Sequence, residues 1–96
     1  MFAFERCSTW LRDEADRLSG QGYDVEVREN SEAMHSLLLR ASSVSMTAEL
    51  LVWVNGNTSA MVYCVPEDRL ALDRHDVVLS DETFKDDLSE FFRLLR

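Results

Sequence analysis

Proline and glycine are scarce in this sequence. Its 96 residues include one Pro and three Gly, whereas 46% are hydrophobic and 29% are charged. This composition excludes collagen-like, low-complexity and disordered chains, which are rich in Gly or Pro or hold too few apolar residues to form a core. The length fits one domain, residues 1–96, that buries somewhat over ~60% of its unfolded surface.

Long apolar runs are also missing. The longest extends from Ala60 to Val65, whereas a membrane-spanning helix needs roughly 18 apolar residues. The first residues contain no basic segment, and Glu5 stands where the apolar stretch of a signal peptide would lie. We therefore expect neither a membrane anchor nor an export signal.

Two cysteines, Cys7 and Cys64, are too few for a disulfide framework, and nothing places them outside a reducing cytosol. Each lies in an apolar segment, so we expect both to be small core residues. The sequence has no zinc-ligand spacing, HExxH helix or calcium loop, and three glycines do not supply a phosphate-binding loop. We expect no bound metal and no cofactor.

Basic residues are outnumbered. Eighteen Asp and Glu oppose ten Lys and Arg, which gives a net charge of −8. Nucleic-acid binding depends on cations that displace phosphate counterions, so DNA and RNA are poor partners, and an anionic membrane would repel the chain. Such a surface suits solubility, or rapid encounter with a basic protein partner. Charge alone favours plain solubility.

Helical patterns occupy both ends of the sequence. The segment from Phe4 to Ser19 has apolar residues at every third or fourth position, and Gly20 and Gly22 then provide a typical helix end. For the second helix, Ser80 is the expected N-cap, with acids in the first turn. The two apolar stripes are Phe4, Cys7, Leu11, Ala15 and Leu18, and Phe84, Leu88, Phe91 and Leu95.

Strand patterns occupy the middle of the chain. Apolar and polar residues alternate over residues 23–28, as in a half-buried strand, and a turn follows at residues 30–32. Four further strands are predicted from their apolar and β-branched content, at His35–Ser42, Thr47–Val54, Ser59–Val65 and Leu70–Leu79. Pro66 ends the fourth strand, because proline lacks the N–H that a strand ladder requires.

The predicted strands fit an antiparallel meander. Asn55-Gly56 tolerates positive φ at both turn positions, so it predicts a tight type I′ hairpin between two of the strands. Two helical stripes must be buried, and one face of the sheet can bury both. We therefore predict an α+β fold with an antiparallel sheet of four to five strands and both helices on one face.

His75 is the strongest candidate for a catalytic base. It lies near Asp73 and Asp76, and a carboxylate beside an imidazole is the beginning of a general base. No Ser or Cys nucleophile is placed with them, so a solvated charge cluster on an edge strand is the better interpretation. His35 is interpreted as a surface or packing residue. We expect no catalytic residue and no enzyme activity.

Each tryptophan permits two interpretations. Trp10 lies beside the first helical stripe, and Trp53 lies next to the predicted hairpin turn. A tryptophan on an open sheet face commonly anchors a protein partner. Alternatively, both are core residues at the margin of the helix–sheet contact. Both faces of the Trp53 strand are apolar, so the sequence leaves its orientation open.

Four stretches of the sequence resemble the TriTu family of bacterial immunity proteins. They are Trp10-Leu11, Gly22-Tyr23-Asp24-Val25-Glu26-Val27, Leu51-Val52-Trp53-Val54-Asn55-Gly56, and Ser80-Asp81-Glu82-Thr83-Phe84 with Leu88. The resemblance extends over most of the chain and includes its length and its order of helix, strands and helix. It adds a functional expectation that composition and spacing do not supply.

This resemblance implies an antitoxin. Members of the family neutralise Rhs-type polymorphic toxins delivered by a type VI secretion system, whose ADP-ribosyltransferase domain uses NAD to modify elongation factor Tu. The immunity protein would stay in the bacterial cytoplasm, bind the toxin in a 1:1 complex and cover its NAD or substrate site. The alternative is a small acidic secretion chaperone or adaptor that binds an effector protein.

The expected binding surface is the face of the sheet that the helices leave open, together with the loop after Val65. The first strand places Asp24 and Glu26 on that face. Four more carboxylates follow in the loop and the last strand, namely Glu67, Asp68, Asp73 and Asp76. If Trp53 points to the same side, it provides an apolar anchor within an acidic rim.

Overall fold

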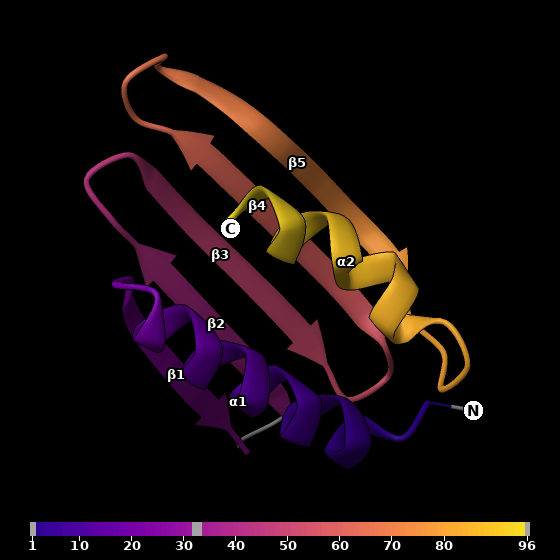
Figure 1. Cartoon of the computed structure of the whole chain (residues 1–96). Coiled ribbons are helices and arrows are strands. Elements are labelled where there is room, and N and C mark those ends of the chain that lie inside the picture. The colour runs from indigo at the N-terminus through magenta and orange to yellow at the C-terminus, as the bar shows by residue number, and fades with distance from the viewer. Residues whose placement is uncertain (1, 32–33, 96) are drawn as a thin grey trace.

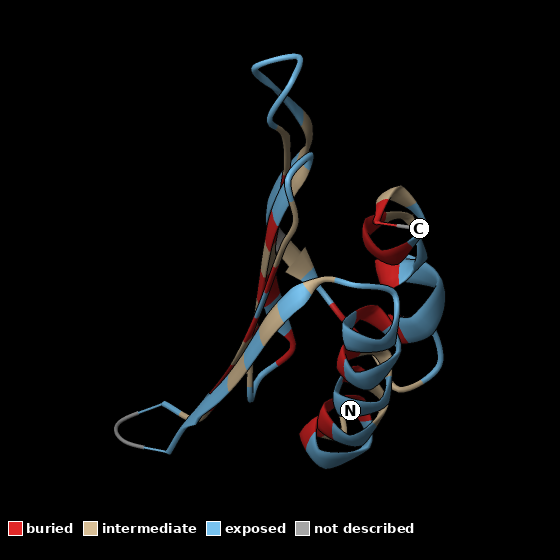
Figure 2. Cartoon of the chain, turned by 60° about the vertical axis from the view of Figure 1, so that its left-hand side comes forward, coloured by how far each residue is buried: buried red, intermediate tan, exposed pale blue. Residues whose placement is uncertain are grey.

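The computed structural model describes residues 2–31 and 34–95, and of Asp76 the backbone alone. Its elements are, in chain order, α1 (Phe4–Gly20), β1 (Asp24–Asn30), β2 (Ser36–Ser42), β3 (Met46–Trp53), β4 (Asn57–Cys64), β5 (Arg69–Val78) and α2 (Phe84–Leu94). The strands lie side by side in this order and form one antiparallel sheet (Figure 1). Both helices cover the same face of the sheet (Figure 2). The predicted α+β meander is confirmed.

The hydrophobic core lies between the sheet and the two helices. α1 packs on β1 and β2, and α2 packs on β4. All members of the two predicted stripes are buried, namely Phe4, Cys7, Leu11, Ala15, Leu18, Phe84, Leu88, Phe91 and Leu95. Leu39, Leu50 and Val62 meet them from the central strands and are 0% exposed. Burial of one such side chain stabilises the fold by ~1.5–3 kcal/mol.

Aromatic side chains connect the two helices. The ring of Trp10 in α1 lies edge to face against Phe84 and Phe92 of α2, with centroid distances of 5.7 and 5.4 Å. An edge-to-face pair adds about 0.5–1.5 kcal/mol to the effect of burial. Trp10 is therefore a partly buried residue at the margin of the core. Neither helix in the described residues has the length and hydropathy needed to cross a membrane.

The Asn55-Gly56 hairpin forms, but not through a type I′ turn. Gly56 has a φ of +92°, whereas Asn55 does not have positive φ. The N–H of Gly56 donates to the carbonyl oxygen of Trp53 over 2.9 Å, and the N–H of Asn57 donates to Asn55 Oδ1 over 3.0 Å. The connection is thus a three-residue loop that ends in a left-handed glycine, so β4 begins two residues earlier than predicted.

Helix α2 begins later than predicted, with Thr83 rather than Ser80 at the N-cap. Ser80 starts a turn that precedes the helix, and its carbonyl oxygen accepts the N–H of Thr83 over 3.4 Å. Asp81 and Glu82 consequently lie outside the first helical turn. The Asp81 carboxylate instead accepts the backbone N–H of Ala3, which connects the N-terminal segment to the β5–α2 loop. β1 extends through Asn30, so the prediction of a turn at that residue is wrong; residue 32 of the predicted turn lies outside the described residues.

Cys7 is fully buried, whereas Cys64 at the end of β4 is partly exposed, so the prediction of a core position holds for Cys7. Burial raises the pKa of the Cys7 thiol to about 12. In the unfolded chain the pKa of a thiol is roughly 8.5. Between these two values the unfolded chain releases a proton that the folded protein retains, so stability decreases as the pH rises.

We expect Cys7→Ala to remove this part of the pH dependence. Above about pH 9, the free energy of unfolding should fall more steeply in the parent than in the variant, by about 1.4 kcal/mol per pH unit. Urea denaturation at several alkaline pH values measures both slopes. Ala15→Gly is a suitable control, because it weakens the same helix without changing an ionisable group. Equal slopes in the parent and in Cys7→Ala would contradict the expectation.

Candidate functional site

The face of the sheet that the helices leave uncovered is the candidate binding surface, called here the open face (Figure 2). Trp53 lies on the open face, because side chains alternate along β3 and its neighbour Val52 is buried against the helices. Trp53 is partly exposed and does not pack against the core cluster. The side chain of Trp53, whose orientation the sequence left open, therefore points to the open face.

Four apolar side chains form a strip on the open face, namely Leu38, Leu51, Trp53 and Met61. Leu38 and Leu51 are directly paired across β2 and β3, so they lie on the same side of the sheet. Met61 of β4 is a diagonal neighbour of Leu51, within reach of a long side chain. All four are partly exposed and lie outside the core cluster. We call these four residues the apolar strip.

Charged residues adjoin the apolar strip. The Arg40 guanidinium lies between two carboxylates, with Nε 2.9 Å from Glu49 Oε2 and Nη1 3.8 Å from Glu26 Oε1. Arg28 also contacts Glu26, with 2.7 Å between Nη2 and Oε2. These pairs are exposed, so each contributes only ~0–1 kcal/mol to stability. They place charges of both signs beside the apolar strip.

The predicted carboxylates lie along the border of the open face. Glu26 and Asp73 lie on the two edge strands and are aligned across the sheet through directly paired residues. They are four strand spacings, or about 19 Å, apart. Glu67 and Asp68 lie in the turn after β4, at the opposite end of that strand from Trp53. The exposed predicted carboxylates are Asp24, Glu26, Glu67, Asp68 and Asp73. They therefore surround the face and do not cluster at Trp53.

His75 belongs to a hydrogen-bonded chain of side chains. Its Nδ1 lies 2.9 Å from Ser59 Oγ, and its Nε2 lies 2.8 Å from Asp73 Oδ1. The expectation that no serine accompanies His75 is thus wrong. The β4–β5 register shifts between Thr58 and Ala60, which places Ser59 beside His75. The sequence does not show this shift.

The Ser59–His75–Asp73 chain lacks the surroundings of a hydrolytic site. The side chains of His75 and Asp73 are 66% and 47% exposed, so water screens their interaction. All three residues lie on paired strands, whose backbone N–H groups bond mainly to the neighbouring strand and are not grouped as an oxyanion hole. The geometry fits the solvated charge cluster. The side chain of Asp76 lies outside the described part of the chain.

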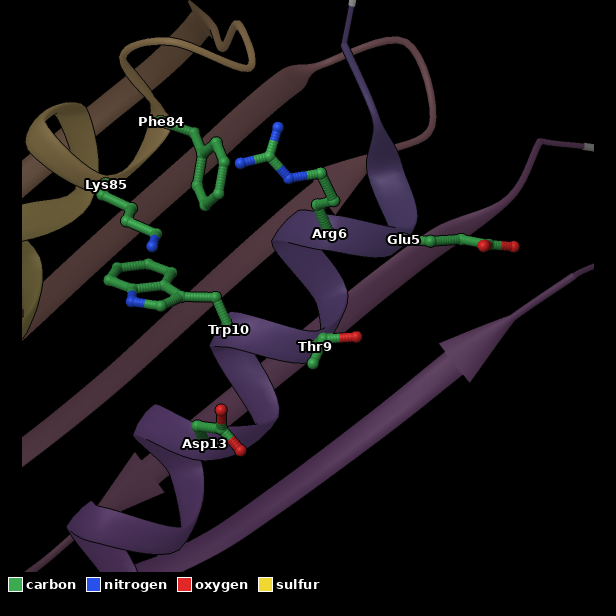
Figure 3. Close-up of a pocket in the computed structure, with 7 residues that line it drawn as sticks. All are labelled: Glu5, Arg6, Thr9, Trp10, Asp13, Phe84 and Lys85. Atoms are coloured by element: carbon green, nitrogen blue, oxygen red, sulfur yellow. The ribbon is translucent and has the colours of Figure 1, made fainter.

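A groove lies on the helix side of the molecule, between α1 and the start of α2 (Figure 3). Its volume is about 410 Å³. The lining residues are Glu5, Arg6, Thr9, Trp10, Asp13, Phe84 and Lys85. Lys85 Nζ lies 6.0 Å from the centroid of the Phe84 ring. The sequence did not predict this helix groove, because its walls come from opposite ends of the chain.

Glu29 connects α1 to the edge of the sheet. Its carboxylate lies 2.9 Å from His35 Nε2 and 3.0 Å from Arg12 Nη2. The hydrogen bond with His35, followed by that with Arg12, lowers the pKa of Glu29. The His35 ring also packs on Phe4, with 4.8 Å between the ring centroids. The interpretation of His35 as a packing residue is confirmed.

Comparison with known proteins identifies the family. Among the described side chains, no group of three His, Cys, Asp or Glu residues could hold a metal ion. Searches of curated proteins and of solved structures gave no match. The family model described as immunity protein TriTu matches residues 4–94, which include both helices and all five strands. The chain therefore belongs to the TriTu family of immunity proteins.

Proposed function

We propose that this immunity protein binds its cognate toxin through the open face of the sheet and inhibits it sterically. The apolar strip carries this proposal. Leu51, Trp53 and their two neighbours are partly exposed, lie outside the core cluster and are adjacent on one face of the sheet, so they form a continuous apolar area. An apolar centre within a charged rim is the usual composition of a protein interface.

The toxin that we propose is an Rhs-type ADP-ribosyltransferase domain that uses NAD to modify elongation factor Tu, delivered by a type VI secretion system. This identity rests on the family resemblance. The net charge of −8 supports it, because a site for the anionic diphosphate of NAD is expected to be basic. Protection would take place in the bacterial cytoplasm, where translation occurs.

The direct test is titration of the purified protein against the proposed toxin domain. We expect a complex that contains the folded toxin domain and the folded immunity protein in a 1:1 ratio by native mass spectrometry, and loss of ADP-ribose transfer to elongation factor Tu at equimolar ratio. Association should slow as salt increases, because charge accelerates the encounter. His75→Ala should protect as well as the parent.

Other outcomes point to other functions. A dimer that holds an extended, unfolded segment of the toxin would indicate a secretion chaperone instead of an antitoxin. Binding with undiminished toxin activity would contradict steric inhibition. Protection against a toxin that acts on a different target would contradict the ADP-ribosylation of elongation factor Tu but not the antitoxin function. Loss of protection in a folded His75→Ala variant would favour an enzyme.

A further inference from the structure

The helix groove contains four charged side chains that make no ion pair within the described residues. Arg6 and Lys85 are the cations, and Glu5 and Asp13 are the anions. Most other described arginines do pair with a carboxylate, namely Arg12, Arg17, Arg28, Arg40, Arg69 and Arg74. The groove thus concentrates unpaired charges of both signs, in equal number, around two aromatic rings.

The two signs lie on different sides of the groove. Glu5, Thr9 and Asp13 follow one i, i+4 ridge of α1, while Arg6 and Trp10 follow the adjacent ridge. Figure 3 shows Arg6 and Lys85 extending toward the aromatic rings, and Glu5 pointing away from them. All four charged side chains belong to exposed residues. They can therefore meet another surface without a change in the fold.

We propose that the helix groove is a self-association surface that takes the same groove of a second copy of this chain. A purely acidic partner would be repelled by Glu5 and Asp13, and a purely basic one by Arg6 and Lys85. Under a two-fold rotation, a residue i of one copy contacts a residue j of the other copy, and residue j of the first contacts residue i of the second. Such a rotation allows the cations of each copy to face the anions of the other. The partly exposed ring of Trp10, which packs on the buried Phe84, supplies its apolar centre.

The net charge of −8 opposes self-association but does not prevent it. The charges of the groove lining sum to zero, so the repulsion between copies arises at longer range. At physiological ionic strength the Debye length is about 8 Å, which weakens long-range repulsion more than contacts across an interface. The groove and the open face lie on opposite sides of the molecule (Figure 2). Each copy in a dimer would therefore keep its open face available.

Sedimentation velocity over a range of protein concentrations tests the proposal. We expect a concentration-dependent dimer at physiological salt. The double variants Arg6→Glu/Lys85→Glu and Glu5→Lys/Asp13→Lys should each dimerise about tenfold more weakly or worse, because like charges then face each other. An equimolar mixture of the two should restore a heterodimer. Arg93→Glu, a cation of α2 outside the groove lining, should leave the dimer unchanged.

The Glu5→Lys/Asp13→Lys variant gives the sharpest comparison. It makes the chain less acidic, so association limited by overall repulsion would become stronger, whereas groove pairing predicts that it becomes weaker. Circular dichroism checks that each variant is folded. A parent protein that stays monomeric, double variants that dimerise like the parent, or a mixture without heterodimer would each overturn the proposal. Toxin binding should be unaffected in all these variants, so the two proposals can fail separately.

Discussion

Trp53→Ala is expected to weaken binding to the toxin by about 2 kcal/mol or more, roughly a thirtyfold increase in the dissociation constant. Trp53 ends the apolar strip and makes no contact with the core cluster, so its removal should alter the interface and not the fold. Dissociation should become faster while association changes little, because a buried anchor acts mainly after encounter. Surface plasmon resonance resolves the two rates, and circular dichroism confirms folding.

A tryptophan on the other side of the molecule provides the control. Trp10→Phe keeps an aromatic ring between the helices and should leave toxin binding unchanged. The rim variant Glu67→Lys/Asp68→Lys should chiefly slow association, since these carboxylates lie at the border of the open face. Normal folding together with unchanged toxin affinity in both Trp53→Ala and the rim variant would show that the binding surface lies elsewhere, and the helices would become the better candidate.

Gly56→Ala is expected to lower the free energy of unfolding by about 2–4 kcal/mol. The residue has a φ of +92°, which disfavours any side chain, and an added Cβ would lie 2.8 Å from the carbonyl oxygen of Leu79. That contact is with backbone, so a side-chain rotation cannot relieve it. The carbonyl oxygen of Gly56 also accepts the N–H of Leu79 over 2.9 Å, so the strain would reach the end of β5.

The other two glycines separate the two causes. Gly22 has a φ of +99° but nothing within 4 Å of an added Cβ. Gly22→Ala should therefore lower the free energy of unfolding only by the cost of placing a side chain at positive φ, ~1–2 kcal/mol. Gly20 is helical with open space around it, so Gly20→Ala should be neutral or stabilise by up to ~1 kcal/mol. Urea denaturation compares the three, and equal losses at Gly56 and Gly22 would show that the Leu79 contact costs nothing.

The periodicity of the sequence predicts the helices and strands because each has one buried face. The stripe of α1 and the alternation in β1 appear directly as apolar spacing. Alternation does not identify the exposed face of β3, however, because Leu50 and Leu51 are equally apolar. That choice depends on which face the helices cover, a property of the tertiary structure.

The parts of the candidate surfaces that were not predicted depend on register or on distant contacts. Ser59 meets His75 only because the β4–β5 pairing shifts by a residue. Thr83 replaces Ser80 at the N-cap because the chain first makes a turn between the sheet and the helix layer. The helix groove joins Trp10 to Phe84 across most of the sequence. Local patterns contain no information about such pairings.

The hydrogen bond between Ala3 and Asp81 also bears on how this protein is made. Its partners are 78 residues apart, so the contact forms only after Asp81 has left the ribosome. Until then Trp10 lacks its α2 neighbours, and the helix-facing side of β4 stays uncovered. Contacts of such large separation slow folding. The part of the core between β4 and α2 can therefore close only after α2 has emerged, so it is exposed for longer than the part beneath α1.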